Sequence, residues 1–191
     1  MPRNLILYVI AGLAGFLVFG VLRALLGDEV GMILAAVALI VCIVVVYRNL
    51  QTNRKVAEAT PQQRTEALAF APPAGKAALY VFRNQFVGRV VGINVLIDGR
   101  EVAQLKSPRF THILLTPGAH RIAGYTGTNK KPGDNEGVAL NAVAGEALVL
   151  KCEVEPQLVG VSVKFTPLAL DAGRTDVAKI ARMVVPDVAE I

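Results

Sequence analysis

Five side chains between positions 107 and 162 are of types that can take part in nucleophilic catalysis. His112 and His120 stand before and after a Pro-Gly pair, and Cys152, Ser107 or Ser162 can be imagined as the nucleophile that such a base activates. No nucleophile-elbow motif or supporting spacing accompanies them, and histidines on strands are usually structural. We therefore predict that the protein is not an enzyme.

Metal and cofactor chemistry has no better support. The chain holds two cysteines, two histidines and no tryptophan. The cysteines lie far apart in the sequence, at Cys42 and Cys152, and no ligand spacing of a metal site occurs. We expect no disulfide, no metal and no cofactor.

A group of basic residues lies near the ends of expected strands in the first half of the β region. Its members are Arg83, Arg89, Lys106 and Arg109. Such a cluster can bind phospholipid headgroups or an acidic partner. The alternative is an ordinary solvated surface.

The composition narrows the class of partner. Of the 191 residues 53% are hydrophobic, the mean hydropathy is +0.50 and the net charge is +5. The positive charge is spread over the chain beyond residue 47, with no stripe of aromatic and arginine side chains that would read a nucleic acid. We expect no nucleic-acid partner.

Two uncharged, mostly apolar runs of about 18 residues each, 5–22 and 30–47, open the chain. Each run is about as long as the hydrocarbon core of a bilayer when helical. We therefore predict that residues 1–47 form a transmembrane helical hairpin with spans of about 4–26 and 30–47. The alternatives are a pair of buried core helices and a cleaved signal peptide.

The distribution of basic residues favours one orientation of this hairpin. Arg3 lies on the same side as Arg48, Arg54 and Lys55, whereas Arg23 lies near the opposite end. Because positive charge is enriched on the cytoplasmic side, we expect both termini in the cytoplasm and the hairpin in a bacterial inner membrane.

Small residues spaced four apart indicate how the two helices can pack. The candidate contacts are Ala11 with Gly15 and Gly31 with Ala35. Chance spacing explains the pattern about as well, because small residues are common in membrane helices.

Residues 48–75 form a polar, partly helical connector. Thr60 with Pro61 and Gln63 is a typical helix start, which predicts a helix over 61–69. A proline-rich spacer ends the connector.

Residues 76–167 show the period of two that is typical of half-buried strands. Asp98-Gly99 predicts a tight hairpin and Pro117-Gly118 a second turn. The pattern predicts an antiparallel β-sandwich. Its strands are expected near 77–83, 91–97, 101–105, 110–116, 119–125, 137–143, 147–155 and 159–166.

Residues 168–191 are expected to form a short C-terminal helix and a tail. Thr175 is a candidate cap, and Val177, Ile180 and Val184 fall on one face of a helix within 171–184. The last residues, 185–191, are expected to be a loose end.

The β region resembles a bacterial family catalogued as domain of unknown function 2846, over about residues 77–166. The residues that fall on its pattern are Tyr80, Arg83, Asp98, Gly99, Pro117, Gly118, His120, Ala144 and Gly145. The resemblance implies a small β-sandwich, often on lipoproteins or membrane-anchored proteins, with no established activity. The predicted two-span hairpin, in place of a lipid anchor, departs from that pattern.

These observations favour a membrane-anchored all-β protein without enzymatic activity. Its β-sandwich is predicted to be an interaction module, with the bilayer and a protein partner in a membrane complex, as an accessory or structural subunit. The alternative function is an envelope or lipid-surface module that uses the basic residues. Homo-oligomer formation is left open.

Overall fold

The computed structural model describes residues 15–21, 23–24, 27–86, 88–127, 129–133, 136–157 and 161–191. The chain divides into two compact units, Met1–Tyr47 and Arg48–Ile191.

The first unit is helical wherever it is described, apart from the turn at Gly27. Residues 15–21 are helical, and helix α2 spans Asp28–Gln51. Gly27 has a φ of +84°, and the Nε atom of Arg23 donates to Oδ1 of Asp28 at 2.6 Å. Gly27 and this ion pair lie between the two apolar runs of the sequence.

The four helix-packing candidates do not all fall within the described part of the chain. Ala11 lies outside the described residues, and nothing lies within 4 Å of a Cβ built on Gly15. Gly31 is buried, and a Cβ built on it would lie 3.2 Å from Cβ of Arg23, whereas Ala35 is exposed.

Among the described residues, no helix combines the length and the apolar character needed to cross a membrane. The membrane-anchored fold class, the predicted two-span hairpin and the localisation in an inner membrane with cytoplasmic termini are therefore wrong. The predicted function as an accessory subunit of a membrane complex, together with its lipid-surface alternative, is wrong for the same reason. Residues 4–14 of the first predicted span lie outside the described residues.

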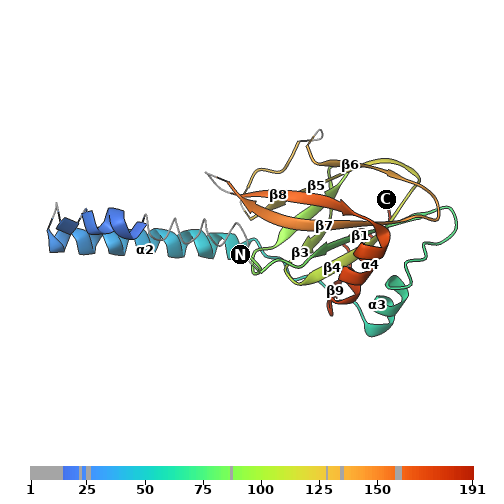
Figure 1. Cartoon of the computed structure of the whole chain (residues 1–191), viewed down its shortest axis with the longest axis horizontal. Coiled ribbons are helices and arrows are strands. Elements are labelled where there is room, and N and C mark those ends of the chain that lie inside the picture. Colours follow the sequence, from blue (N-terminus) through green and yellow to red (C-terminus); the bar gives the residue numbers. More distant parts are fainter. Residues whose placement is uncertain are drawn as a thin grey trace. The chain divides into compact units, whose positions relative to one another are not determined.

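Arg48–Ile191 contains two sheets that form a sandwich (Figure 1). The strand order is β8-β7-β1-β4-β9 in one sheet and β3-β2-β5-β6 in the other. The strands are β1 Ala77–Arg83, β2 Ile93–Ile97, β3 Arg100–Leu105, β4 Arg109–Leu115, β5 Gly118–Thr126, β6 Val138–Ala142, β7 Ala147–Pro156, β8 Val161–Leu168 and β9 Met183–Val184. Each of the eight strands expected from the sequence overlaps one of β1 to β8, so the predicted sandwich is confirmed.

Both faces of the five-stranded sheet are covered around β1. One face meets the four-stranded sheet across a core that includes Leu79, Val81, Val95, Ile113 and Ile122. The other face is covered by helices α3 (Pro61–Ala67) and α4 (Leu170–Ala178), over a second core that includes Phe70, Tyr80, Phe82, Phe110 and Val177. Because both faces are covered, β1 is buried along its whole length.

The sequence pattern predicts antiparallel sheets, but two of the strand pairs are parallel. β1 pairs in parallel with β7, and β4 pairs in parallel with β9. The other named strand pairs are antiparallel. Parallel pairs join strands that are distant in the sequence, so no local turn motif predicts them.

The expected helix start in the connector is confirmed. Thr60 accepts from the backbone of Gln63 while the Gln63 side chain accepts from the backbone of Thr60, which is a complete capping box, and Pro61 opens the helix. At Asp98 and Gly99 φ is +51° and +75°, as the predicted tight hairpin requires.

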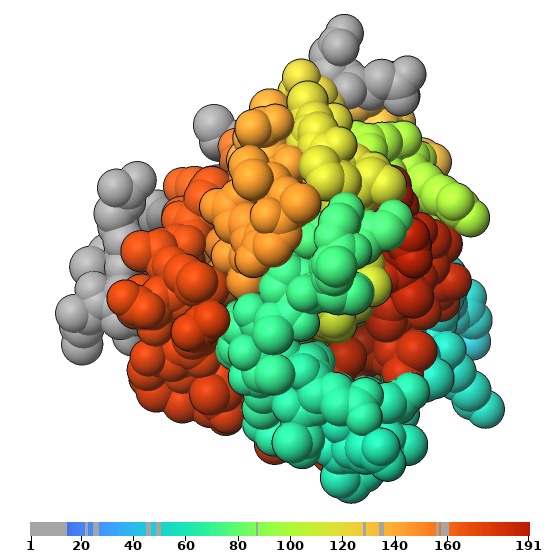
Figure 2. All heavy atoms as spheres, turned by 90° about the vertical axis from the view of Figure 1, so that its right-hand side faces the viewer, coloured from blue at the N-terminus to red at the C-terminus, as the bar shows by residue number. Residues whose placement is uncertain are grey.

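The C-terminal prediction is partly wrong. Helix α4 ends at Ala178, its N-cap is Ala169, and Thr175 lies inside it, donating to the carbonyl of Asp171. Val184 belongs to strand β9. The last residues are not loose, because backbone bonds tie Ala189 and Ile191 to Leu114, and the tail lies beside the connector (Figure 2).

Helix α4 lies so close to β7 that a side chain at Gly173 has no room. A Cβ built there would lie 2.6 Å from the Cβ of Val149. Gly173→Ala should therefore lower the free energy of unfolding by about 1–2 kcal/mol, because overpacking outweighs the better helix propensity of alanine. Urea denaturation measures the change. In a Val149→Ala background, which creates the missing space, the same substitution should instead be neutral or stabilising; a loss as large as in the wild type would contradict the close contact.

Candidate functional site

The groups considered for catalysis are not assembled into one site. His112 lies in β4 of the five-stranded sheet, whereas His120 lies in β5 of the four-stranded sheet. Cys152 is fully buried, and burial raises the pKa of its thiol to about 12. The hydroxyl of Ser107 accepts from the backbone of Gln85, and Ser162 accepts from Gln157.

His120 is held as a structural cation. Its Nε2 lies 2.8 Å from the carbonyl oxygen of Thr116, and its Nδ1 lies 2.7 Å from Oδ2 of Asp98. Both neighbours are acceptors, so the ring satisfies both only when both nitrogens carry a proton. Burial lowers the pKa of His120, but its hydrogen bonds to Asp98 and Thr116 and the charge of Asp98 raise it by more.

His112 belongs to a stack of rings beneath α3 and α4. Its ring lies 4.8 Å from that of Tyr80, which lies 4.3 Å from Phe70, and the guanidinium of Arg174 covers Phe70 at 5.2 Å. The Tyr80 hydroxyl donates to the carbonyl of Ala67 at 2.6 Å. Burial lowers the pKa of His112, so the ring serves as a neutral packing group.

The basic residues singled out from the sequence separate into two roles. Arg83 is fully buried, and its guanidinium donates to the backbone carbonyls of Gly88, Val91 and Leu105. Burial lowers the pKa of Arg83. This arginine therefore holds the chain between β1 and β2 in place and is not part of a surface patch.

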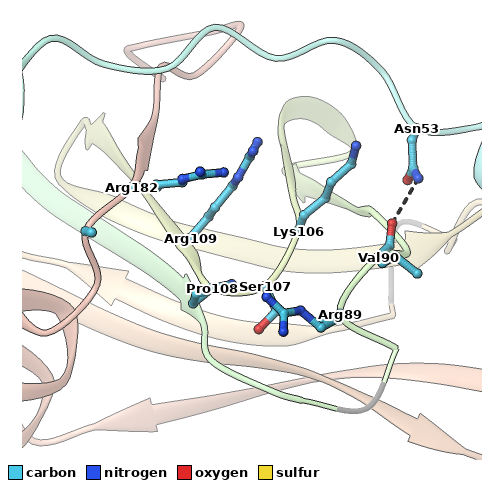
Figure 3. A pocket seen from close by; sticks show the side chains of 9 residues that line it. Asn53, Arg89, Val90, Lys106, Ser107, Pro108, Arg109 and Arg182 are labelled. Atoms are coloured by element: carbon cyan, nitrogen blue, oxygen red, sulfur yellow. Dashed lines mark hydrogen bonds between the residues drawn. The ribbon is translucent and has the colours of Figure 1, made fainter.

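The other three line a single cavity of about 590 Å³, which we call the basic pocket. Arg89 comes from the β1–β2 connection, while Lys106 and Arg109 come from the end of β3 and the start of β4. Arg182, just before β9, completes the set. Lys106 and Arg109 project in the same direction, and the Arg182 side chain points toward Arg109 (Figure 3).

Asn53 fixes one wall of the basic pocket. Its Nδ2 donates to the carbonyl of Val90 at 2.9 Å (Figure 3). Its Oδ1 accepts from the backbone of Gly92 at 2.7 Å. A Cβ on Gly92 would lie 2.6 Å from Cδ of Gln104, so this close approach requires glycine. The wall is thus built from the connector and the β1–β2 connection together.

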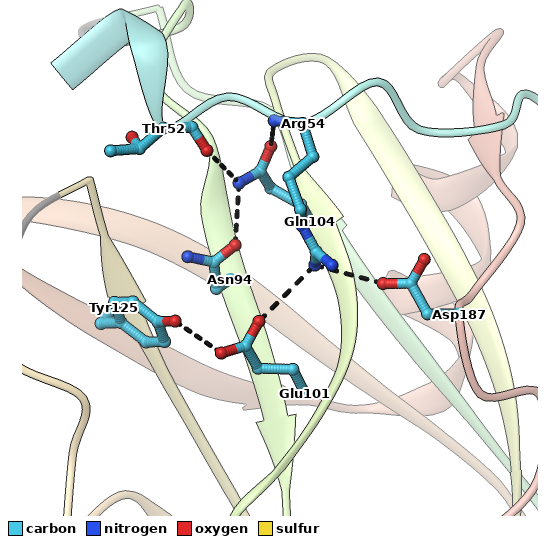
Figure 4. Close-up of polar contacts among 7 residues, drawn as sticks. All are labelled: Thr52, Arg54, Asn94, Glu101, Gln104, Tyr125 and Asp187. Atoms are coloured by element: carbon cyan, nitrogen blue, oxygen red, sulfur yellow. Dashed lines mark hydrogen bonds and ion pairs between the residues drawn. The ribbon is translucent and has the colours of Figure 1, made fainter. Parts of the chain in front are cut away.

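The buried amide of Gln104 clamps the connector to the four-stranded sheet (Figure 4). Its Nε2 donates to the carbonyl of Thr52 and to Oδ1 of Asn94, and its Oε1 accepts from the backbone of Arg54. The guanidinium of Arg54 in turn pairs with Asp187 at 3.1 Å and with Glu101 at 3.7 Å. These bonds place Asn53, between Thr52 and Arg54, at the pocket.

Arg182 reaches the pocket because the C-terminal tail pairs with β4. Phe110 donates its backbone N–H to the carbonyl of Arg182, and Phe110 is in register with Met183. The sequence pattern did not identify Arg182, since it depends on pairing between segments more than 70 residues apart. No local signal in the sequence points to that pairing.

Comparisons of the chain with known protein families, curated proteins and solved structures find no match. The resemblance to domain of unknown function 2846 stays a prediction.

The two histidines should give opposite pH dependences of stability. The raised pKa of His120 stabilises the fold fully below about pH 6.5, and the contribution is lost as the pH rises through the folded-state value. The free energy of unfolding of the wild type minus that of His120→Gln should therefore fall between pH 6 and 9. Urea denaturation across this range measures the difference.

His112→Gln is the matched control, because the lowered pKa of His112 makes the folded state lose stability as the pH falls below about 6.5. The wild type minus His112→Gln difference should rise with pH. Two differences with the same slope would contradict the assignment of His120 as a cation.

Proposed function

We propose that Arg48–Ile191 is a binding domain for a compact anionic ligand that carries phosphate or carboxylate groups. The observation that supports it is the basic pocket, where four cationic side chains from three separate segments line one cavity of about 590 Å³. This volume lies in the range of roughly 300–1,000 Å³ that is usual for small-molecule sites.

The chemistry of the lining suits an oxyanion. Arginine presents a planar fork of N–H donors that matches phosphate and carboxylate, and lysine adds a compact charge. Arg89 and Lys106 have no ion-pair partner among the residues that the structure describes. Their charges are therefore available to a ligand.

Binding is favoured over catalysis by the placement of the reactive groups. His120 has both nitrogens engaged, His112 is stacked against Tyr80, and Cys152 is buried with a raised pKa. Ser107 lines the basic pocket, but its hydroxyl accepts from the backbone of Gln85, and no histidine is among the residues that line the pocket. We therefore propose that the pocket holds its ligand without a histidine to activate a nucleophile.

Isothermal titration of the full chain with inorganic pyrophosphate tests this function. Arg89→Gln and Lys106→Gln should each weaken binding about tenfold, because each removes one charge-assisted contact worth roughly 1.5 kcal/mol. Raising the salt concentration should weaken binding further.

Arg100→Gln is the matched control, since Arg100 is exposed, lies at the β2–β3 turn and does not line the basic pocket. It removes the same charge and should leave the affinity unchanged. The proposal is wrong if pyrophosphate does not bind, or if Arg100→Gln weakens binding as much as Arg89→Gln.

A further inference from the structure

Glu58 brings a carboxylate of the connector to the basic pocket. Its Oε1 lies 2.9 Å from Nη2 of Arg109 and 3.8 Å from Nη1 of Arg182. The backbone holds Glu58 there. Glu58 pairs with Val184 in an isolated β-bridge, and the N–H of the neighbouring Ala59 donates to the carbonyl of Met183. The carboxylate of Glu58 therefore shows that these two arginines can bind an oxyanion.

The four cations thus form two unequal pairs. Arg109 and Arg182 are partly neutralised by Glu58, whereas Arg89 and Lys106 have no ion-pair partner among the described residues. A ligand with one anionic group binds only Arg89 and Lys106. A ligand with two adjacent anionic groups binds both pairs, provided that Glu58 leaves Arg109 and Arg182.

We propose that the ligand belongs to the diphosphate class and that one of its two phosphates takes the place of Glu58 on Arg109 and Arg182. The other phosphate binds Arg89 and Lys106. This inference rests on the proposed function, and it adds that Glu58 makes the pocket select two linked anionic groups over one.

Displacement of Glu58 is physically inexpensive. Its side chain is 48% exposed, so the departing carboxylate regains water, and the mostly buried guanidinium of Arg109 keeps an anionic partner because the phosphate replaces the carboxylate. A phosphate group carries more negative charge than a carboxylate and also accepts the arginine fork. The exchange therefore favours the ligand.

A double-mutant cycle on the full chain tests the displacement. With pyrophosphate as the probe, Glu58→Gln should strengthen binding about tenfold in the wild type, but by less than about twofold in an Arg109→Gln background. The gain disappears in that background because Glu58 and the phosphate compete for Arg109. A long-range effect of the Glu58 charge would give the same gain in the wild type and in Arg109→Gln.

A second arm compares pyrophosphate with orthophosphate. Arg109→Gln should weaken pyrophosphate about tenfold but orthophosphate by less than about threefold, since Glu58 keeps a single phosphate away from Arg109. Because Arg109 is mostly buried, Arg182→Gln repeats both arms with an exposed side chain, and circular dichroism confirms folding.

Glu190→Gln is the matched control for charge. Glu190 pairs with Lys76 and does not line the pocket, so its loss should leave the pyrophosphate affinity within about twofold. Equal gains from Glu58→Gln in both backgrounds, or equal losses of the two probes in Arg109→Gln, would overturn the inference while pyrophosphate binding itself persists. Absence of pyrophosphate binding to every variant would instead remove the proposed function.

Discussion

The buried guanidinium of Arg83 is the interaction on which the basic pocket depends. A charge without partners inside a protein costs several kcal/mol, so Arg83 needs acceptors, and the backbone carbonyls of Gly88, Val91 and Leu105 provide them. The connection between β1 and β2 must therefore turn the carbonyls of Gly88 and Val91 inward. The same connection carries Arg89 at the pocket, so one buried cation fixes the backbone that positions an accessible one.

Most of the β fold could be predicted because its signals are local. The period-two pattern located eight strands, Asp98 and Gly99 specified a tight turn, and Thr60 with Gln63 specified a helix start. The C-terminal segment was misjudged because the spacing of Val177, Ile180 and Val184 suits one helix, while pairing with β4 takes Val184 into a strand. The predicted hairpin in 1–47 rested on apolar length alone, and no helix among the described residues meets that criterion.

The candidate site was only partly predictable from the sequence, because local signals are visible there and pairing between distant segments is not. Arg89, Lys106 and Arg109 lie close together in the fold because they stand where neighbouring strands begin and end. Arg83 was misassigned because its strand is covered on both faces, which a strand pattern does not reveal. Arg182 and Glu58 depend on backbone bonds among the connector, the tail and β4, and pairing over such distances leaves no local pattern.

The position of a heavy oxyanion in crystals of the full chain measures directly whether the basic pocket binds anions. Tungstate mimics phosphate in charge and shape, and its anomalous scattering locates it without reference to the protein. We expect a tungstate peak within hydrogen-bond distance of Arg89 and Lys106, with the Arg109 and Arg182 side chains facing the same cavity. Peaks at other surfaces, with none in the basic pocket, would contradict anion binding there.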